Sequence, residues 1–300
     1  MKHTVTMIKG EHYLLPFSKE ILMKDLLFCG FNIDNGYKLA QKAEKEINSL
    51  EKEKLLSQTV RTIIRNLIAA ESSAAFLERY DGWQKLRYSN KPIVILLGGV
   101  SGVGKSSIAR ELGYHLDIKR IIGTDTIRQI MRMTFTKEFM PAIHTSSFES
   151  AHRENNKKNT AEHKKKVWDN FTQQAEYVLV GVKAILNRSV DEKLSTIIEG
   201  VHLPPLLCEK IVKKFSKKND IIIKYFLLTT ADKEQHTNHF IMRDCQTGSS
   251  RKADIYLSHL DNILDIQNNL QQEASRVRAH VVDTGDMNQS IKKIISTMIE

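Results

Sequence analysis

A chain of 300 residues, 41% of them hydrophobic, is long enough for two domains, and its net charge of +10 indicates an anionic partner. The three cysteines are widely spaced, which argues against a disulfide framework or a zinc site and fits a reducing compartment. Neither a signal peptide nor an apolar stretch of membrane-spanning length is present, so we expect a cytoplasmic protein with no membrane partner.

Residues 1–90 are predicted to form a small, mostly helical domain. Ser18 is a good N-cap for a helix that ends at Gly30, and Asn35-Gly36 is expected to turn the chain into the next helix. Ser89–Pro92 indicates the boundary to a second domain, which we place at 91–300. The elements expected in the first domain are strands over 4–8 and 13–15 and helices over 18–29, 37–50, 57–70 and 74–86.

From residue 92 on, apolar strand-like runs alternate with helical stretches. This alternation is typical of an α/β fold in which a parallel sheet is covered by helices on both faces. The expected strands are 93–97, 120–122, 196–198, 221–228 and 279–282.

The first of these strands runs into Gly99–Ser106, GVSGVGKS, which fits the pattern G-x-x-x-x-G-K-[ST] and precedes a helical stretch. Glycines let the backbone wrap a polyphosphate, Lys105 is expected to reach the β- and γ-phosphates, and the Ser106 hydroxyl is expected to bind Mg²⁺. This context favours an ATP site over an ordinary glycine-rich turn. The residues predicted to bind the nucleotide are Gly99, Val100, Ser101, Gly102, Val103, Gly104, Lys105, Ser106 and Ser107.

The second strand ends at Asp125, one position before a predicted helix. A carboxylate there could position or deprotonate an acceptor hydroxyl, could hold Mg²⁺ through water, or could simply cap the helix. Arg128, one turn later, could face the same opening and bind a carboxylate or phosphate, and the alternative is a surface arginine.

The third strand ends at Glu199, an acidic residue in the position expected for a partner of Mg²⁺. His202, three residues on, could contact the acceptor or pack in the turn. His144 lies in a run of small hydroxyl residues that could bind an anionic acceptor or cap a helix.

A polar stretch at 239–251 lies between two predicted helices. In P-loop kinases this connection is a lid, and its arginines stabilise charge on the transferring group. Arg243 and Arg251 are therefore candidate catalytic residues, and the alternative is a flexible surface loop.

Two resemblances cover the chain. Residues 1–70, with VTMIKGEHYLLPFSKEILMKDLL, resemble an ATP-cone domain, a regulatory nucleotide-binding module, although only Lys9 provides a basic side chain before Gly10, where ATP cones usually carry a basic pair. Residues 92–300, with GGVSGVGKSSIARELG, IIGTDTIRQIMR, PAIHTSSFES and IIEGVHLPP, resemble the archaeal 2-phosphoglycerate kinases. That resemblance implies transfer from ATP to the 3-hydroxyl of 2-phosphoglycerate, with Lys105 and Ser106 serving ATP and Mg²⁺ and Asp125 and Arg128 facing the acceptor.

Other functions remain open: a P-loop kinase acting on a nucleoside, a sugar phosphate or a polynucleotide end, or a non-catalytic ATP-dependent regulator. The predicted helix at 206–218 places its lysines opposite an apolar face, as a solvated surface helix does. Aromatic residues make up 7% of the chain and do not alternate with basic ones, as they would in a single-strand stacking surface. A small anionic substrate is therefore favoured over nucleic acid, and the oligomeric state stays open.

Overall fold

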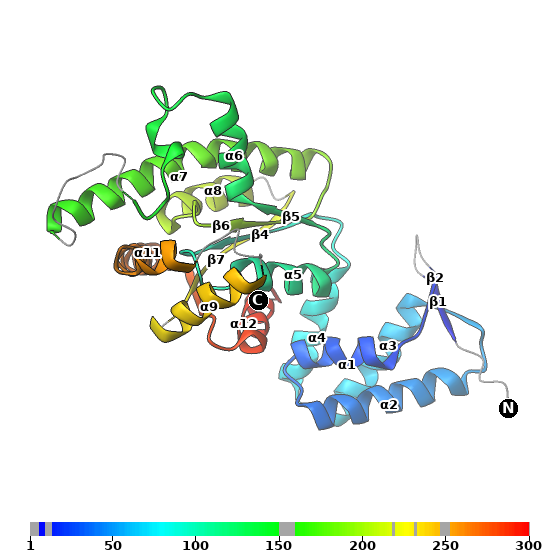
Figure 1. Cartoon of the computed structure of the whole chain (residues 1–300). Helices are drawn as coiled ribbons and strands as arrows, with labels where there is room; N and C mark the ends of the chain where they lie inside the picture. The colour runs from blue at the N-terminus through cyan, green and yellow to red at the C-terminus, as the bar shows by residue number, and fades with distance from the viewer. Residues whose placement is uncertain are drawn as a thin grey trace. The chain divides into compact units, whose positions relative to one another are not determined.

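The computed structural model describes residues 6–9, 14–149, 160–217, 220–230, 233–246 and 253–299 (Figure 1). The chain forms two compact units. The first comprises Met1–Ser89 together with Lys292–Glu300, and the second comprises Asn90–Ile291. The end of the chain, which the sequence assigned to the second domain, thus groups with the first unit.

The second unit is built on a five-stranded sheet with the strand order β5-β6-β4-β7-β8. Every neighbouring pair is parallel. All six residues of β4, at the centre, are buried, as expected for a strand covered on both faces. The predicted α/β fold is confirmed. The strands are β4 Ile93–Gly98, β5 Arg120–Gly123, β6 Thr196–Gly200, β7 Ile222–Thr229 and β8 His280–Asp283.

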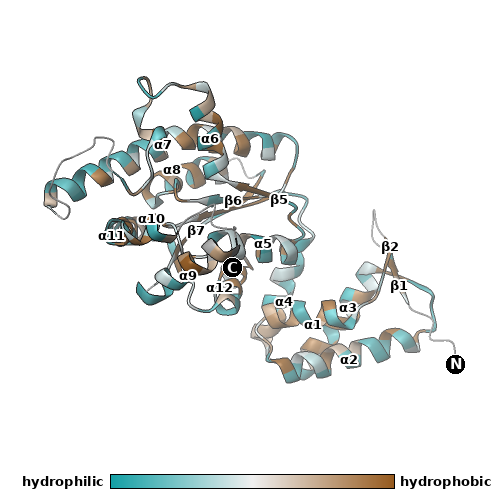
Figure 2. Ribbon diagram, in the orientation of Figure 1, coloured by the Kyte–Doolittle hydropathy of each residue, from teal (hydrophilic) through white to brown (hydrophobic). Residues whose placement is uncertain are grey.

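Helices cover both faces of this sheet. Figure 1 shows α7 and α8 above it and α5 below it, and Figure 2 shows hydrophobic residues gathered in its strands. On α8, Lys210, Lys213 and Lys214 are exposed while Ile211 and Phe215 are buried, so the predicted amphipathic helix is confirmed. The helices are α5 Lys105–Leu116, α6 Thr124–Thr134, α7 Ala161–Asp191, α8 Pro205–Ser216, α9 Lys233–Gln246, α10 Ala253–Leu257, α11 Leu260–Val277 and α12 Met287–Ile299, with a 3₁₀ turn η1 at Pro141–His144.

The first unit packs helices against a three-stranded sheet with the order β2-β1-β3. Its buried core includes Leu26, Tyr80 and Trp83. The predicted cap is confirmed, because Ser18 Oγ accepts from Ile21 N at 3.2 Å. The elements are β1 Met7–Lys9, β2 Leu14–Pro16, α1 Lys19–Phe28, α2 Ile33–Ser49, β3 Lys54–Leu56, α3 Ser57–Glu71 and α4 Ala74–Arg87.

The turn predicted at Asn35-Gly36 is wrong. Both residues lie inside α2, which begins at Ile33 because Asn32 caps it, its Oδ1 accepting from Asn35 N at 2.8 Å. Gly36 is buried in the helix near Phe31, and a Cβ at this position would make only an ordinary contact of 3.7 Å with the Phe31 Cβ. Strand β3, which pairs in parallel with β1, was not predicted.

Candidate active site

The phosphate-loop prediction is confirmed in its local geometry: β4 leads into the loop, and α5 begins at Lys105. Gly99 and Gly102 have φ of +143° and +89°, values that side-chain-bearing residues rarely adopt. A Cβ at Gly99 would also lie 2.4 Å from the carbonyl oxygen of Leu228. Glycine is therefore required at these positions, and the backbone N–H groups of the loop can approach a ligand closely.

Lys105 is the buried cation of this loop. Its side chain folds back over the loop, and Nζ donates to the carbonyl oxygen of Val100 at 2.7 Å, while the residue is 8% exposed. It stands at the N-terminus of α5, where the helix dipole also favours an anion. The geometry gives the phosphate groups of a nucleotide a charge partner within the loop.

Ser106 and Glu199 meet at the edge of the sheet where the parallel strands end. Ser106 Oγ donates to Glu199 Oε1 at 2.9 Å. The contact follows from topology, because β6 lies directly beside β4 and Leu97 is in register with Glu199. A hydroxyl and a carboxylate form the all-oxygen donor set that a hard divalent cation such as Mg²⁺ prefers, so these residues fit the predicted metal site.

Asp125 lies in the first turn of α6, which begins at Thr124, two residues earlier than predicted. The N-cap is Gly123, so the capping role considered for Asp125 is wrong. Its side chain is 60% exposed, and Oδ1 lies 3.9 Å from Nε of Arg128. An exposed carboxylate of this kind can accept a proton from a bound ligand.

Hydrogen bonds to two neighbouring residues hold the Arg128 side chain in place. Its side chain is 19% exposed, and Nη1 donates to the carbonyl oxygen of Thr145 at 3.1 Å and to Oε1 of Gln174 at 3.2 Å. Burial lowers its pKa, and the nearby Asp125 opposes that shift. The Arg128 guanidinium is thus fixed in orientation beside Asp125, which suits recognition of a carboxylate or a phosphate.

Gln174 completes a buried polar network that no sequence motif indicated. Its Nε2 donates to the carbonyl oxygens of Ala142 at 2.5 Å and Thr145 at 3.1 Å. Its Oε1 receives Nε2–H of His202 at 2.8 Å. One signal was available: position 174 lies on the buried face of α7 with Phe171 and Val178, where a polar side chain needs buried partners.

His202 belongs to this network and does not face the open site. It is fully buried, and its Nδ1 lies 2.9 Å from Oγ1 of Thr124. Because Nε2 donates to Gln174, the neutral ring accepts from Thr124 at Nδ1. Burial lowers the pKa of His202 to about 3, so the ring stays uncharged. The expected substrate contact therefore gives way to the alternative: His202 packs in the turn and positions Thr124 and Gln174.

The remaining candidate residues are His144, Arg243 and Arg251. His144, partly exposed, donates from Nε2 to the carbonyl oxygen of Phe135 at 2.9 Å and so joins η1 to the end of α6. Arg243 lies in α9, but its side chain is outside the described part of the chain, as is the whole of Arg251. The two lid arginines remain predictions.

Replacement of Gln174 by leucine is expected to lower the free energy of unfolding of the second unit by about 2–4 kcal/mol. The substitution keeps the volume but leaves the N–H of His202 and the carbonyl of Ala142 without their partner. Urea unfolding measures the loss. The matched control is Gln173→Leu on the exposed face of α7, which should change stability by less than about 0.5 kcal/mol. Equal effects of the two substitutions would contradict the network.

The second unit is a P-loop kinase domain. Its glycine-rich loop leads into a helix and contains a buried lysine. A serine–glutamate pair and an aspartate–arginine pair lie at the edge of the sheet where the loop begins.

No protein-family model matches the chain. It is 32% identical to the 2-phosphoglycerate kinase of Methanopyrus kandleri over 295 residues, covering 98% of this chain and 87% of the relative. It is 33% identical to the 2-phosphoglycerate kinase of Pyrococcus horikoshii, covering 97% of this chain and 92% of the relative.

The chain belongs to the 2-phosphoglycerate kinase family. Among solved structures, a gluconokinase from Sinorhizobium meliloti is 14% identical with a TM-score of 0.37, covering 69% of this chain and 91% of that one. In the described part of the chain, no helix is long and apolar enough to cross a membrane.

Proposed function

We propose that this protein transfers the γ-phosphoryl group of ATP to the free 3-hydroxyl of 2-phosphoglycerate, giving ADP and 2,3-bisphosphoglycerate. The observation that carries the proposal is the similarity to 2-phosphoglycerate kinases over nearly the whole chain. The phosphate loop and the two polar pairs beside it supply the groups that such a transfer needs.

The donor half of the reaction depends on the loop. Its N–H groups and Lys105 bind the phosphates and offset the charge that develops on them. Ser106 and Glu199 would hold Mg²⁺, which supplies a Lewis acid to the phosphate oxygens when bound. Because the Ser106 hydroxyl and the Glu199 carboxylate are already 2.9 Å apart, little rearrangement is needed to bring both to one cation.

The acceptor half depends on Asp125 and Arg128. The hydroxyl oxygen of 2-phosphoglycerate forms a bond to the γ-phosphorus, the bond to the bridging oxygen of ADP breaks, and the hydroxyl proton passes to Asp125. Arg128 orients the substrate through its carboxylate or phosphate. Arg243 and Arg251 close the site as lid arginines in this proposal, and His144 adds a second polar group on the acceptor side.

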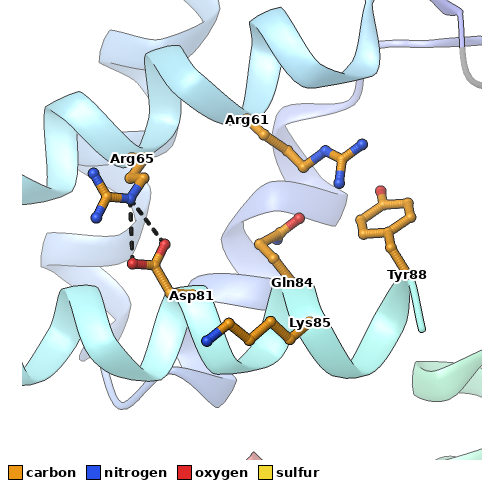
Figure 3. Close-up of a pocket in the computed structure, with 6 residues that line it drawn as sticks. All are labelled: Arg61, Arg65, Asp81, Gln84, Lys85 and Tyr88. Carbon is orange, nitrogen blue, oxygen red and sulfur yellow. Dashed lines mark hydrogen bonds and ion pairs between the residues drawn. The ribbon is translucent and has the colours of Figure 1, made fainter.

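The first unit has a regulatory role in this proposal, as the ATP-cone resemblance implies. It holds a pocket of about 450 Å³ between α3 and α4 (Figure 3). Arg61 lies 4.2 Å above the ring of Tyr88, Arg65 is paired with Asp81 at 3.0 Å, and Lys85 adds a third cation. The excess positive charge and the aromatic ring suit a nucleotide effector.

An acceptor screen tests the proposed reaction. ADP release is measured with 2-phosphoglycerate, 3-phosphoglycerate, gluconate, nucleosides and sugar phosphates under saturating ATP and Mg²⁺. We expect turnover with 2-phosphoglycerate to exceed that with gluconate, nucleosides and sugar phosphates by at least about 10²-fold, since a site that pairs both a carboxylate and a phosphate rejects analogues that lack either group. Comparable turnover with a nucleoside or sugar phosphate would overturn the assignment.

A second arm of the same screen addresses nucleic acid. Labelled RNA and DNA should bind weakly at about 150 mM salt, because a site with few phosphate contacts lacks the counterion release that drives polynucleotide binding. Tight binding of either polymer, together with no turnover of 2-phosphoglycerate, would favour a polynucleotide kinase instead.

A further inference from the structure

Helix α9 packs directly on the phosphate loop, although the two are separated by more than a hundred residues of sequence. The contact point is Gly102. A Cβ at this position would lie 2.7 Å from Cζ of Phe240 and 3.1 Å from Nδ1 of His236. Glycine is therefore needed here for two reasons: a side chain would collide with α9, and the backbone has a positive φ of +89°. A movement of α9 toward the loop would therefore displace the loop backbone at Gly102.

The second contact is a hydrogen bond. His239, also on α9, donates from Nδ1 to the carbonyl oxygen of Gly102 at 2.6 Å. In a planar trans peptide the C=O of one residue and the N–H of the next point in opposite directions. Holding the Gly102 carbonyl toward α9 therefore turns the N–H of Val103 to the other side of the peptide. Phosphate loops bind polyphosphate through N–H groups that point inward.

Aromatic packing holds α9 within hydrogen-bond distance of the Gly102 carbonyl. The ring of Phe240 stacks on that of Tyr256 with 4.9 Å between centroids, and on that of His236 with 6.1 Å. His236 is fully buried and packs against the position of Gly102, and the side chain of Gln267 lies near its ring. Burial lowers its pKa, so the ring is neutral. Its ring lies against Gly102 and acts as a spacer between α9 and the loop.

We propose that His239 is a positioning residue for the phosphate loop: its hydrogen bond to Gly102 sets the peptide that follows so that the N–H of Val103 faces the polyphosphate. His236 and Phe240 set the distance between α9 and the loop so that this hydrogen bond can form. The inference rests on the proposed function only in that the loop binds ATP; the acceptor plays no part in it.

Nucleotide affinity of variants at His239 tests the inference in the full-length protein. Asparagine places an amide N–H where Nδ1 stands, whereas leucine has nearly the same shape and no donor. We expect His239→Leu to weaken ATP binding about tenfold, the effect of one lost hydrogen bond of about 1.4 kcal/mol. His239→Asn should stay within about threefold of the wild type. The matched control, Asn238→Leu on the exposed face of α9, should bind ATP like the wild type.

Inorganic tripolyphosphate, used as a competitor, separates the loop from the adenosine site. It should show the same ranking of variants as ATP, because His239 acts on the phosphates. Equal affinities of His239→Leu and wild type would overturn the inference, as would equal losses in the leucine and asparagine variants. An effect on ATP without one on tripolyphosphate would also overturn it, since His239 would then act on the adenosine.

A measurement on the unmodified protein covers the case in which the leucine variant does not fold. The backbone amide proton of Val103 should shift downfield by NMR when tripolyphosphate is added, because it gains a charged acceptor. An unchanged resonance under saturation would contradict the inference. Since these readouts are binding and not turnover, a protein that binds ATP but fails to phosphorylate 2-phosphoglycerate would refute the proposed function and leave this inference standing.

Discussion

A Lys105→Met variant is expected to lose phosphoryl transfer by at least about 10³-fold while keeping its fold. Lys105 is the buried cation of the phosphate loop, and its Nζ donates to the Val100 carbonyl at 2.7 Å. Methionine keeps the length and apolar part of the side chain, so the loss reflects charge removed from the transition state. The rate of ADP release under saturating ATP measures it.

The matched control is Lys210→Met, which removes a lysine from the exposed face of α8. It should leave turnover within about twofold of the wild type, as a solvated surface charge contributes little. Turnover of Lys105→Met above about a tenth of the wild-type rate would contradict the assignment of the donor site.

An Asp125→Asn variant is expected to lower kcat by about 10²–10⁴-fold, with KM for ATP nearly unchanged. The carboxylate is exposed and lies 3.9 Å from Arg128, on the side of the site where we propose that the acceptor binds. Asparagine cannot take the hydroxyl proton. Steady-state kinetics with ATP varied at saturating 2-phosphoglycerate separates the two parameters.

Asp117→Asn provides the comparison, because Asp117 is exposed, and its φ of +53° is one that asparagine tolerates. It should leave both parameters unchanged. If Asp125→Asn raised KM for ATP and spared kcat, Asp125 would belong to the donor side, and the division of roles proposed here would be wrong.

The parts of the fold that the sequence predicted are those encoded by neighbouring residues. The strand, the loop and the helix around Gly99–Ser106 are contiguous. The apolar run, the glycines and the helical spacing that predict them therefore all lie within one short stretch of sequence. The meeting of Ser106 and Glu199 was also predictable in part, because all strands of a parallel sheet carry their carboxyl ends at the same edge.

The parts that failed depend on distant or competing contacts. Asn35-Gly36 is a strong turn signal, but Asn32 supplies an earlier helix cap, so the helix begins at Ile33 and continues through both residues. Three-residue β3 carries too few residues for any alternation to show.

The buried network that holds Arg128 could not be assembled from the sequence either. Its members come from α6, η1, α7 and the turn after β6, and only the fold brings them together. His202 illustrates the consequence: its position after a strand suggested a ligand contact, whereas tertiary packing gives both ring nitrogens protein partners. The contact between His239 and Gly102 has the same origin.

Product identification tests the central claim most directly. The protein is incubated with ATP, Mg²⁺ and 2-phosphoglycerate, and the products are followed by ³¹P NMR. The account predicts that the γ-phosphate resonance of ATP declines as a second phosphomonoester resonance, coupled to the C3 protons, appears in equal amount, as 2,3-bisphosphoglycerate requires. ATP consumed with release of inorganic phosphate alone, or no consumption of ATP, would contradict it.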